Sequence, residues 1–369
     1  GLEIALNYPG LLETWESTDD LYAKAKQEPL SRKVFPPSAF DDAGRSARTN
    51  ALQLTENAQP AIGTFSAGLY KLLHSAGFRP DFVAGHSFGE LTALWAAEVF
   101  SDSDFLSLAK ARGAAMAAPD DPDFDAGTML AVRASIKEIQ TTLGAFPDIT
   151  IANDNAKKQV VVAGPTESIQ AARKALEANK ISSVLLPVSA AFHTDLVKHA
   201  QKPFSKALDA VTFNTPTVSV VANSTAEPYP ESAESARKLL ADHLLRPVRF
   251  REQIQKIHSD GGTCFVEFGP RNVLTNLVKD ILKDHDHVVV ALNASKDKRS
   301  DDQLRHAILQ LRVAGLPLRD LDTHRVAEAS PTRKQKMNVR LSGHNFVSEK
   351  TRKAFDHALQ DGHQVQTPV

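Results

Sequence analysis

The chain has 369 residues, 42% of them hydrophobic, and is longer than one ordinary domain requires. Its 43 basic and 44 acidic residues nearly cancel, so the charge gives no sign of a nucleic-acid or membrane-surface partner. One cysteine, Cys264, excludes an internal disulfide framework, and no apolar run approaches the length of a membrane-spanning helix. Since a signal-peptide pattern is also missing, we expect a cytoplasmic protein.

The first predicted helix covers residues 60–76. Pro60 suits a first helical turn, apolar residues follow at helical spacing, and Gly77 suits the end. A strand, a tight turn and a second helix are then predicted at residues 82–84, 85–89 and 91–99. Such a strand–turn–helix unit is typical of a buried parallel sheet.

Residues 128–193 have a different pattern, which predicts a separate small subdomain. Strands are expected at residues 129–132, 149–152, 160–163 and 184–188, with helices at 136–143 and 168–178. This order, β-α-β-β-α-β, is that of a ferredoxin-like α+β unit.

Alternating strands and helices return after about residue 210. Strands are predicted at 218–222, 264–268 and 288–292, and helices at 236–245, 273–282 and 304–313. We therefore predict an α/β fold: a large parallel-sheet, hydrolase-like domain, interrupted by the small ferredoxin-like subdomain. The large domain would comprise residues 1–127 and 194–325, and the polar residues 326–369 would form a linker or extension.

Residues 85–90 read GHSFGE and contain the pattern G-x-S-x-G, in which a serine occupies a sharp strand-to-helix turn. Ser87 is the candidate nucleophile, and the backbone N–H of Phe88 is a candidate oxyanion donor at the start of the following helix. Glycines occupy positions 85 and 89, and we expect that a Cβ at either position would clash in this turn. The pattern also occurs by chance, so the apolar strand before it and the helix after it add weight to the assignment.

A serine hydroxyl needs a base to become a good nucleophile, and the chain has 13 histidines. His86 is adjacent to the serine, but neighbouring side chains on a turn point apart, which favours a structural role. His193 follows the last strand of the small subdomain, at a domain junction where clefts are common. Its rivals are His199, His243 and His258, which lie in polar helical stretches and are expected to be solvated.

At this point the chain resembles a known family, the malonyl-CoA:acyl-carrier-protein transacylases and the acyltransferase domains of fatty-acid and polyketide synthases. The resemblance covers residues 1 to about 325. It rests on these blocks, in the family's order and spacing: Gln59-Pro60-Ala61, GHSFGE at 85–90, Ala111-Arg112-Gly113, Gln159 to Gly164, Ala191-Phe192-His193, Arg246 to Phe250, and Glu267-Phe268-Gly269-Pro270.

The resemblance implies a Ser–His dyad, with Ser87 as nucleophile and His193 as base. In the family a backbone carbonyl orients the histidine, and the matching position is about Arg249. Arg112 matches the arginine that holds the free carboxylate of the substrate, which a guanidinium fork can grip with two parallel hydrogen bonds. Taken alone, Arg112 would be read as a solvated helix residue.

Three further positions are implied to contact substrate or to set selectivity. Gln59 belongs to the first matching block. Phe192 fills the space that an α-methyl group would need, as in malonyl-selective members, although it also suits core packing. Phe88 likewise resembles the malonyl pattern.

One departure concerns the start of the chain. Family members begin with a strand and a Gly-x-Gly-x-Gln segment, whose glutamine N–H is the second oxyanion donor, and no such segment occurs in this sequence. The chain opens instead at Gly1, without a starting methionine, in a stretch that resembles the helix after that segment. We therefore expect a fragment of a longer chain, with the second donor upstream of Gly1 and reduced activity.

The sequence thus predicts an acyltransferase that moves malonyl from malonyl-CoA to the phosphopantetheine thiol of an acyl carrier protein, with no bound cofactor and no metal. It would be a domain of a fatty-acid or polyketide megasynthase, next to domains such as a ketosynthase. The sequences of residues 55–61 and 309–315 most resemble those of polyunsaturated-fatty-acid synthases, and enediyne and glycolipid synthases are near relatives. The alternatives are an α/β-hydrolase-type serine esterase or thioesterase, and a catalytically impaired docking domain.

Overall fold

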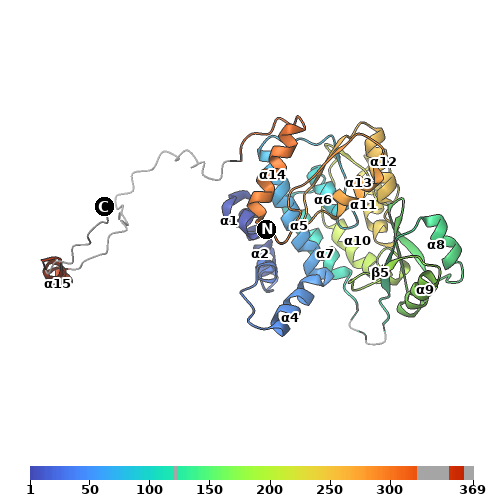
Figure 1. The fold of residues 1–369 in the computed structure, drawn as a ribbon, viewed down its shortest axis with the longest axis horizontal. Coiled ribbons are helices and arrows are strands. Elements are labelled where there is room, and N and C mark those ends of the chain that lie inside the picture. Colours follow the sequence, from blue (N-terminus) through green and yellow to red (C-terminus); the bar gives the residue numbers. More distant parts are fainter. Residues whose placement is uncertain (120, 122–123, 322–348, 361–369) are drawn as a thin grey trace. The chain divides into compact units, whose positions relative to one another are not determined.

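The computed structural model describes residues 1–119, 121, 124–321 and 349–360. The chain divides into two compact units, residues 1–323 and 324–369, which are described separately. Unit 1 opens with helix α1, Leu2–Asn7, where the family resemblance implies a helix (Figure 1). Three helices that were not predicted follow: α2 Pro9–Lys24, α3 Leu30–Val34 and α4 Asp42–Gln53. Helix α4 has no buried residue, so it lacks the apolar stripe by which helices are found.

Helix α5, Thr55–Ser75, begins earlier than predicted, so Pro60 lies inside it rather than in its first turn. A proline there leaves the carbonyl of the residue four positions back without its helical partner. That residue is Glu56, whose carbonyl oxygen is 3.5 Å from the hydroxyl of Tyr22. Helix α5 packs against α2 and against α7, Asp102–Ala115, and most of its residues are buried.

The parallel strands form two separate pairs in the described part of unit 1. One joins β1, Phe82–Val83, to β6, Ser219–Val220, and the other joins β7, Cys264–Glu267, to β8, Val288–Ala291. The strands are parallel as predicted, but they are shorter than expected and make no single continuous sheet.

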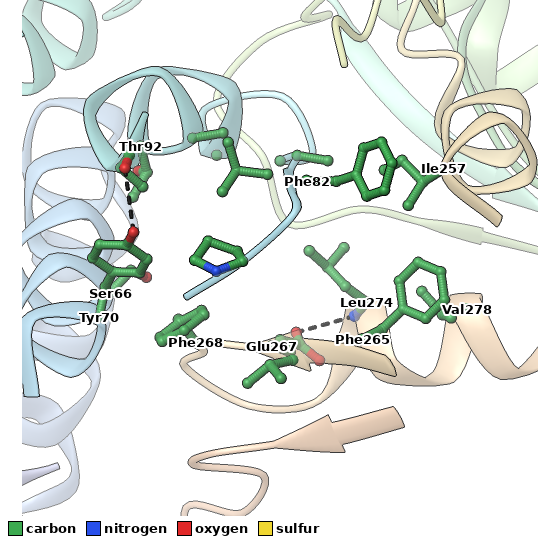
Figure 2. Close-up of a pocket in the computed structure, with 18 of the residues that line it drawn as sticks. Ser66, Tyr70, Phe82, Thr92, Ile257, Phe265, Glu267, Phe268, Leu274 and Val278 are labelled. Atoms are coloured by element: carbon green, nitrogen blue, oxygen red, sulfur yellow. Dashed lines mark hydrogen bonds between the residues drawn. The ribbon is translucent and has the colours of Figure 1, made fainter. Parts of the chain in front are cut away.

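A cavity of about 550 Å³ lies between β1 of the first pair and β7 of the second (Figure 2). Strands β1 and β7 contribute to its lining, including the side chains of Phe82, Phe265 and Glu267. Helices α5, α6 (Gly89–Ala96), α12 (Phe250–Ser259) and α13 (Val273–Ile281) complete it with mainly apolar side chains. The cavity is therefore bordered by strands of both pairs and by four helices.

The small antiparallel sheet has four strands in the order β3-β4-β2-β5. Their bounds are β2 Thr128–Val132, β3 Thr150–Ala156, β4 Gln159–Gly164 and β5 Ser183–Leu185, with helices α8 Ile136–Leu143 and α9 Thr166–Ala178. The chain order is β-α-β-β-α-β, as the sequence predicts. Apolar residues of β2 and β4 pack against Ile139 of α8 and Leu176 of α9 to form a separate core.

Backbone bonds tie this small sheet to the rest of unit 1. The amide of Asp154 in β3 donates to the carbonyl of Val248 at 2.8 Å, and the amide of Val248 donates to Ala152 at 2.8 Å. Between β5 and α14 the remaining helices are η1 Asp195–Ala200, α10 Gln201–Asp209, α11 Ala233–Asp242 and η2 His243–Leu245, and α14 itself is Ser300–Val313. Helix η2 also packs against η1, so the segment that includes η2 lies close to the junction after β5.

Unit 2 contains helix α15, Glu349–Gln360, within the stretch predicted to be a linker or extension. The other residues of 326–369 lie outside the described part, so that prediction concerns residues the structure does not describe. In the parts of the chain that are described, no helix is long and apolar enough to cross a membrane. The same residues hold no cluster of three or more His, Cys, Asp or Glu placed to bind a metal ion.

Candidate active site

The turn after β1 presents Ser87 in a left-handed backbone conformation, with φ +51°. This region is uncommon for residues other than glycine, and it is typical of a nucleophile held in a tight bend. A Cβ on Gly85 would lie 2.0 Å from the carbonyl carbon of Gly89, so only glycine fits at 85. The parallel expectation for Gly89 is wrong, because a Cβ there would have nothing within 4 Å.

The backbone after Ser87 enters helix α6 and leaves one amide available. The amides of Gly89, Glu90 and Leu91 donate to the carbonyls of His86, Ser87 and Phe88. The N–H of Phe88 has no such partner among the described residues. It stands at the N-terminus of α6, where free amides and the helix dipole favour negative charge.

Ser87 and His193, 106 positions apart, meet in the structure, with 2.8 Å between Ser87 Oγ and His193 Nε2. His193 is also left-handed, with φ +63°, and is 3% exposed. Its Nδ1 lies 2.9 Å from the carbonyl oxygen of Arg246 and 3.2 Å from that of His243. Both oxygens can only accept, so Nδ1 carries the proton and Nε2 is free to accept one from the serine.

The expectation that the carbonyl of Arg249 orients the histidine is therefore wrong. Arg249 precedes α12, and its carbonyl accepts the amide of Gln253 in the first turn of that helix. The carbonyls that face His193 come instead from the start of η2 and from Arg246, which ends it.

The pKa of His193 is lowered to about 3, mainly by burial, with further lowering by the positive charge of Arg112 and by His86. The imidazole is therefore neutral at physiological pH. A neutral ring with an unprotonated Nε2 at hydrogen-bond distance from a serine hydroxyl is the form that a general base needs.

The other histidine candidates do not face the serine. His86 Nε2 lies 2.7 Å from Asn155 Oδ1, which fits the structural role expected for it. His199 Nε2 contacts the carbonyl of Ala117, and His258 Nδ1 contacts that of Gly262. The expectation that His243 is solvated is wrong: it is 1% exposed, and its ring centroid lies 5.2 Å from that of His193.

Arg112 is a buried cation in this site, 1% exposed on α7. Its Nη1 donates to Gln59 Oε1 of α5 at 2.6 Å, while Nη2 is buried without a partner among the described residues. The guanidinium lies 5.7 Å from the ring of Phe88, next to the serine. Burial lowers the pKa of Arg112 to about 10 and the charge of Glu90 raises it, so the group stays charged at neutral pH. The reading of Arg112 as a solvated helix residue is thereby excluded.

Helix α7 approaches α5 closely next to this cation, which brings Gln59 and Arg112 together. A Cβ on Gly113 would lie 2.7 Å from the carbonyl oxygen of Thr55, so glycine at 113 permits the close approach. Gln59 also donates from Nε2 to Met116 Sδ at 3.4 Å. The Ala-Arg-Gly sequence therefore supplies both the charge and the room for its support.

Phe192 precedes His193 and is partly buried against two hydrophobic clusters, one of which includes Phe88. The packing role expected for Phe192 is therefore present.

Three buried polar residues around the elbow were not predicted: Glu90, Asn223 and Tyr229. Asn223 Oδ1 accepts the amide of Ser87 at 2.6 Å, and Asn223 Nδ2 donates to the carbonyl of Gly85. A signal was available for Asn223 alone, which directly follows the strand predicted at 218–222, since parallel sheets place their sites at the carboxyl edge.

Comparison with known proteins gives the family. A model described as acyl transferase domain matches residues 25–317. One subunit of the polyunsaturated fatty acid synthase of Thraustochytrium sp. is 31% identical over 372 residues, covering 98% of this chain but only 13% of that protein. Malonyl CoA-acyl carrier protein transacylase of Synechocystis sp. is 34% identical over 236 residues, covering 63% of this chain and 78% of that protein.

Among solved structures, the acyltransferase domain from the second module of the salinomycin polyketide synthase is similar, with a TM-score of 0.74 and 30% identity. The match covers 85% of this chain and 70% of that one. It confirms the predicted α/β class, and the family match identifies the chain as a transferase. The chain belongs to the acyl transferase domain family.

Proposed function

We propose that this domain transfers malonyl from malonyl-CoA to the phosphopantetheine thiol of an acyl carrier protein through an acyl-Ser87 intermediate. The observation that carries the proposal is the unpaired Nη2 of Arg112, a buried cation beside the Ser87–His193 pair. The similar transacylase of Synechocystis sp. supports it, because its name specifies malonyl CoA and an acyl carrier protein.

The chemistry follows a two-step, ping-pong course. His193 Nε2 accepts the proton of Ser87 as the serine oxygen attacks the thioester carbonyl, and the N–H of Phe88 donates to the oxyanion that forms. The carbon–sulfur bond then breaks, and His193 returns the proton to the departing coenzyme A thiolate. In the second half the carrier thiol gives its proton to His193, attacks the acyl-serine and releases Ser87 with its proton restored.

Selection of malonyl would come from the far end of the acyl group, since every acyl thioester presents the same carbonyl to the serine. Nη1 of Arg112 donates to Gln59, and Nη2 has no hydrogen-bond partner among the described residues. A carboxylate is the group that a guanidinium fork binds with greatest geometric specificity. Gln59 would keep the fork in place, and Phe192 would limit space beside the α-carbon.

The rival functions are less well supported. An α/β-hydrolase of the esterase or thioesterase type uses an Asp or Glu to orient its histidine. Here His193 Nδ1 faces two backbone carbonyls. A docking domain without activity would have no need for a serine and a histidine at 2.8 Å beside a buried, partly unpaired arginine.

The wider setting that we propose is a polyunsaturated-fatty-acid synthase, because the match to the Thraustochytrium sp. synthase runs along 98% of this chain. Neighbouring domains such as a ketosynthase, and a cytoplasmic location, are part of the same proposal.

Intact-mass spectrometry after mixing the chain with malonyl-CoA tests the function. A malonyl adduct on wild type that is absent from Ser87→Ala is expected, and a carrier protein should then remove it. Rapid hydrolysis of simple esters without a lasting adduct would favour the esterase instead.

A further inference from the structure

The position of Asn223 beside the elbow follows from strand register. Strands β1 and β6 are parallel, with Val83 opposite Val220. Three residues beyond Val220 is Asn223, and four beyond Val83 is Ser87. The two residues that leave these strands therefore meet at the carboxyl edge of the sheet. Asn223 is fully buried there.

The side chain of Asn223 bridges both sides of the turn. Its Oδ1 accepts the amide of Ser87 at 2.6 Å, and its Nδ2 donates to the carbonyl of Gly85. One planar amide thus fixes the residue two positions before the nucleophile and the nucleophile itself. Ser87 needs this support because its φ of +51° is strained for a residue with a side chain.

The backbone of Asn223 is fixed as firmly as its side chain. Its amide donates to Glu90 Oε2 at 2.6 Å, and its carbonyl accepts the amide of Arg249 at 2.9 Å. Glu90, fully buried, also accepts the hydroxyl of Tyr229 on Oε1. Glu90 lies three residues after Ser87, in the first turn of α6. Asn223 is therefore bonded to the elbow at Ser87 and to the helix that follows it at Glu90.

The groups around the carboxyl group of Glu90 shift its pKa in both directions. Burial raises the pKa of Glu90 to about 7, while the bonds from Tyr229 and Asn223 and the charge of Arg112 lower it. His243 also faces the carboxyl group, with 4.0 Å between Nδ1 and Glu90 Oε1, and burial holds the pKa of His243 well below its usual value.

We propose that Asn223 is a positioning residue for acyl transfer, which holds Ser87 in line with His193 through its side-chain amide, and that Glu90 keeps Asn223 in place. This inference rests on the proposed function for its substrate, but it concerns the reactivity of Ser87 toward any acylating agent. Neither Asn223 nor Glu90 touches the reacting atoms, so both act through the backbone of the elbow.

The test measures the rate of Ser87 acylation by malonyl-CoA and, separately, its rate of modification by diisopropyl fluorophosphate. Asn223→Ala should lower the maximal rate of both by on the order of 10²-fold, the cost of misplacing a catalytic group by about 1 Å. The malonyl-CoA concentration for half-maximal rate should stay unchanged, because Arg112 and Gln59 are on other elements.

Asn223→Asp supplies a second readout, with the folded fraction of the variant measured at each pH so that a loss of stability is separated from a loss of rate. The carboxylate can still accept from Ser87 but presents a second acceptor to the carbonyl of Gly85, whereas its protonated form can donate there. The rate relative to wild type should therefore rise as the pH falls. Asn179→Asp is the matched control, since exposed Asn179 also donates from Nδ2 to a backbone carbonyl, that of Ala175 at 2.9 Å.

A wild-type maximal rate in Asn223→Ala, or a ratio in Asn223→Asp that does not change with pH, would overturn the proposal. If Asn223→Ala does not fold, the pH dependence of Asn223→Asp decides alone. If wild type reacts with diisopropyl fluorophosphate but not with malonyl-CoA, the proposed function fails. The fluorophosphate rates of the same variants then still decide the role of Asn223.

Discussion

The carbonyl oxygen of Arg246 lies 2.9 Å from Nδ1 of His193, where a hydrolase triad would have a carboxylate. A neutral acceptor fixes the tautomer of the ring but adds no negative charge to stabilise an imidazolium. His193 can therefore act as a base whose orientation depends on backbone geometry rather than on a third side chain.

The first prediction separates the ring of His193 from the side chain of Arg246. His193→Ala should slow acylation of Ser87 by about 10²–10⁴-fold, the usual contribution of a general base. Arg246→Ala keeps the backbone carbonyl and should leave the rate close to that of wild type. Intact-mass time courses with malonyl-CoA measure both. A large loss in Arg246→Ala would show that its side chain, not its carbonyl, matters.

The second prediction concerns the acid limb of the pH–rate profile, where the rate falls because His193 takes up a proton. Burial, and then the charge of Arg112, lower the pKa of His193 to about 3, so the free enzyme should keep its base well below pH 6.5. Arg112→Gln removes the charge and should move the acid limb to higher pH. The pH dependence of Ser87 modification by diisopropyl fluorophosphate checks this, and a wild-type midpoint near 6.5 would contradict it.

Part of the fold and of the site could be predicted from the sequence, because it depends on local sequence patterns. The elbow at 85–90 and the six elements between Thr128 and Leu185 have clear periodicity and turn residues. The Ser87–His193 pairing is not local, and it came from the family resemblance rather than from spacing.

Other features have no local signal. The carbonyls that face His193 belong to the backbone, so no residue type marks them, and the prediction of Arg249 missed by three positions. Burial of His243 also depends on packing, since a histidine in a polar helical stretch looks solvated. The split of the parallel strands into two pairs depends on which edges meet in space.

The third prediction uses His243, whose two ring nitrogens are buried without a hydrogen-bond partner among the described residues, while Nδ1 lies 4.0 Å from Glu90 Oε1. Burial lowers its pKa well below the usual value, so it stays neutral in the folded state while the unfolded chain takes up a proton below about 6.5. Its contribution to stability is therefore present above that pH and lost as the pH falls.

His243→Phe should remove this acid sensitivity and the cost of unpaired polar atoms, about 1–3 kcal/mol. Urea unfolding at pH 7 and pH 5 should show a variant at least as stable as wild type, with the larger gain at pH 5. Acylation of Ser87 should persist, because the carbonyl of residue 243 is kept. Lower stability at both pH values would contradict the prediction.

The last prediction concerns selectivity and rests on Arg112 and Phe192 together. Malonyl carries a carboxylate where acetyl has a hydrogen, so of these two groups only malonyl would offer a partner to the buried Nη2 of Arg112, which has none among the described residues. Arg112→Ala should therefore lose most malonyl loading while acetyl loading survives or rises. Lys110→Ala is the matched control, because this cation on the same helix lies 4.4 Å from the ring of Tyr22 instead.

Phe192 should act on the α-carbon rather than on the carboxylate. Rejecting one methyl group by shape is worth only about 1–3 kcal/mol, so Phe192→Ser should admit methylmalonyl without abolishing malonyl loading. Competition between malonyl-, methylmalonyl- and acetyl-CoA, followed by intact-mass analysis, measures all three preferences at once. If Arg112→Ala keeps the wild-type ratio of malonyl to acetyl, the carboxylate is bound elsewhere. Nη2 of Arg112 would then have a structural role rather than a role in binding substrate.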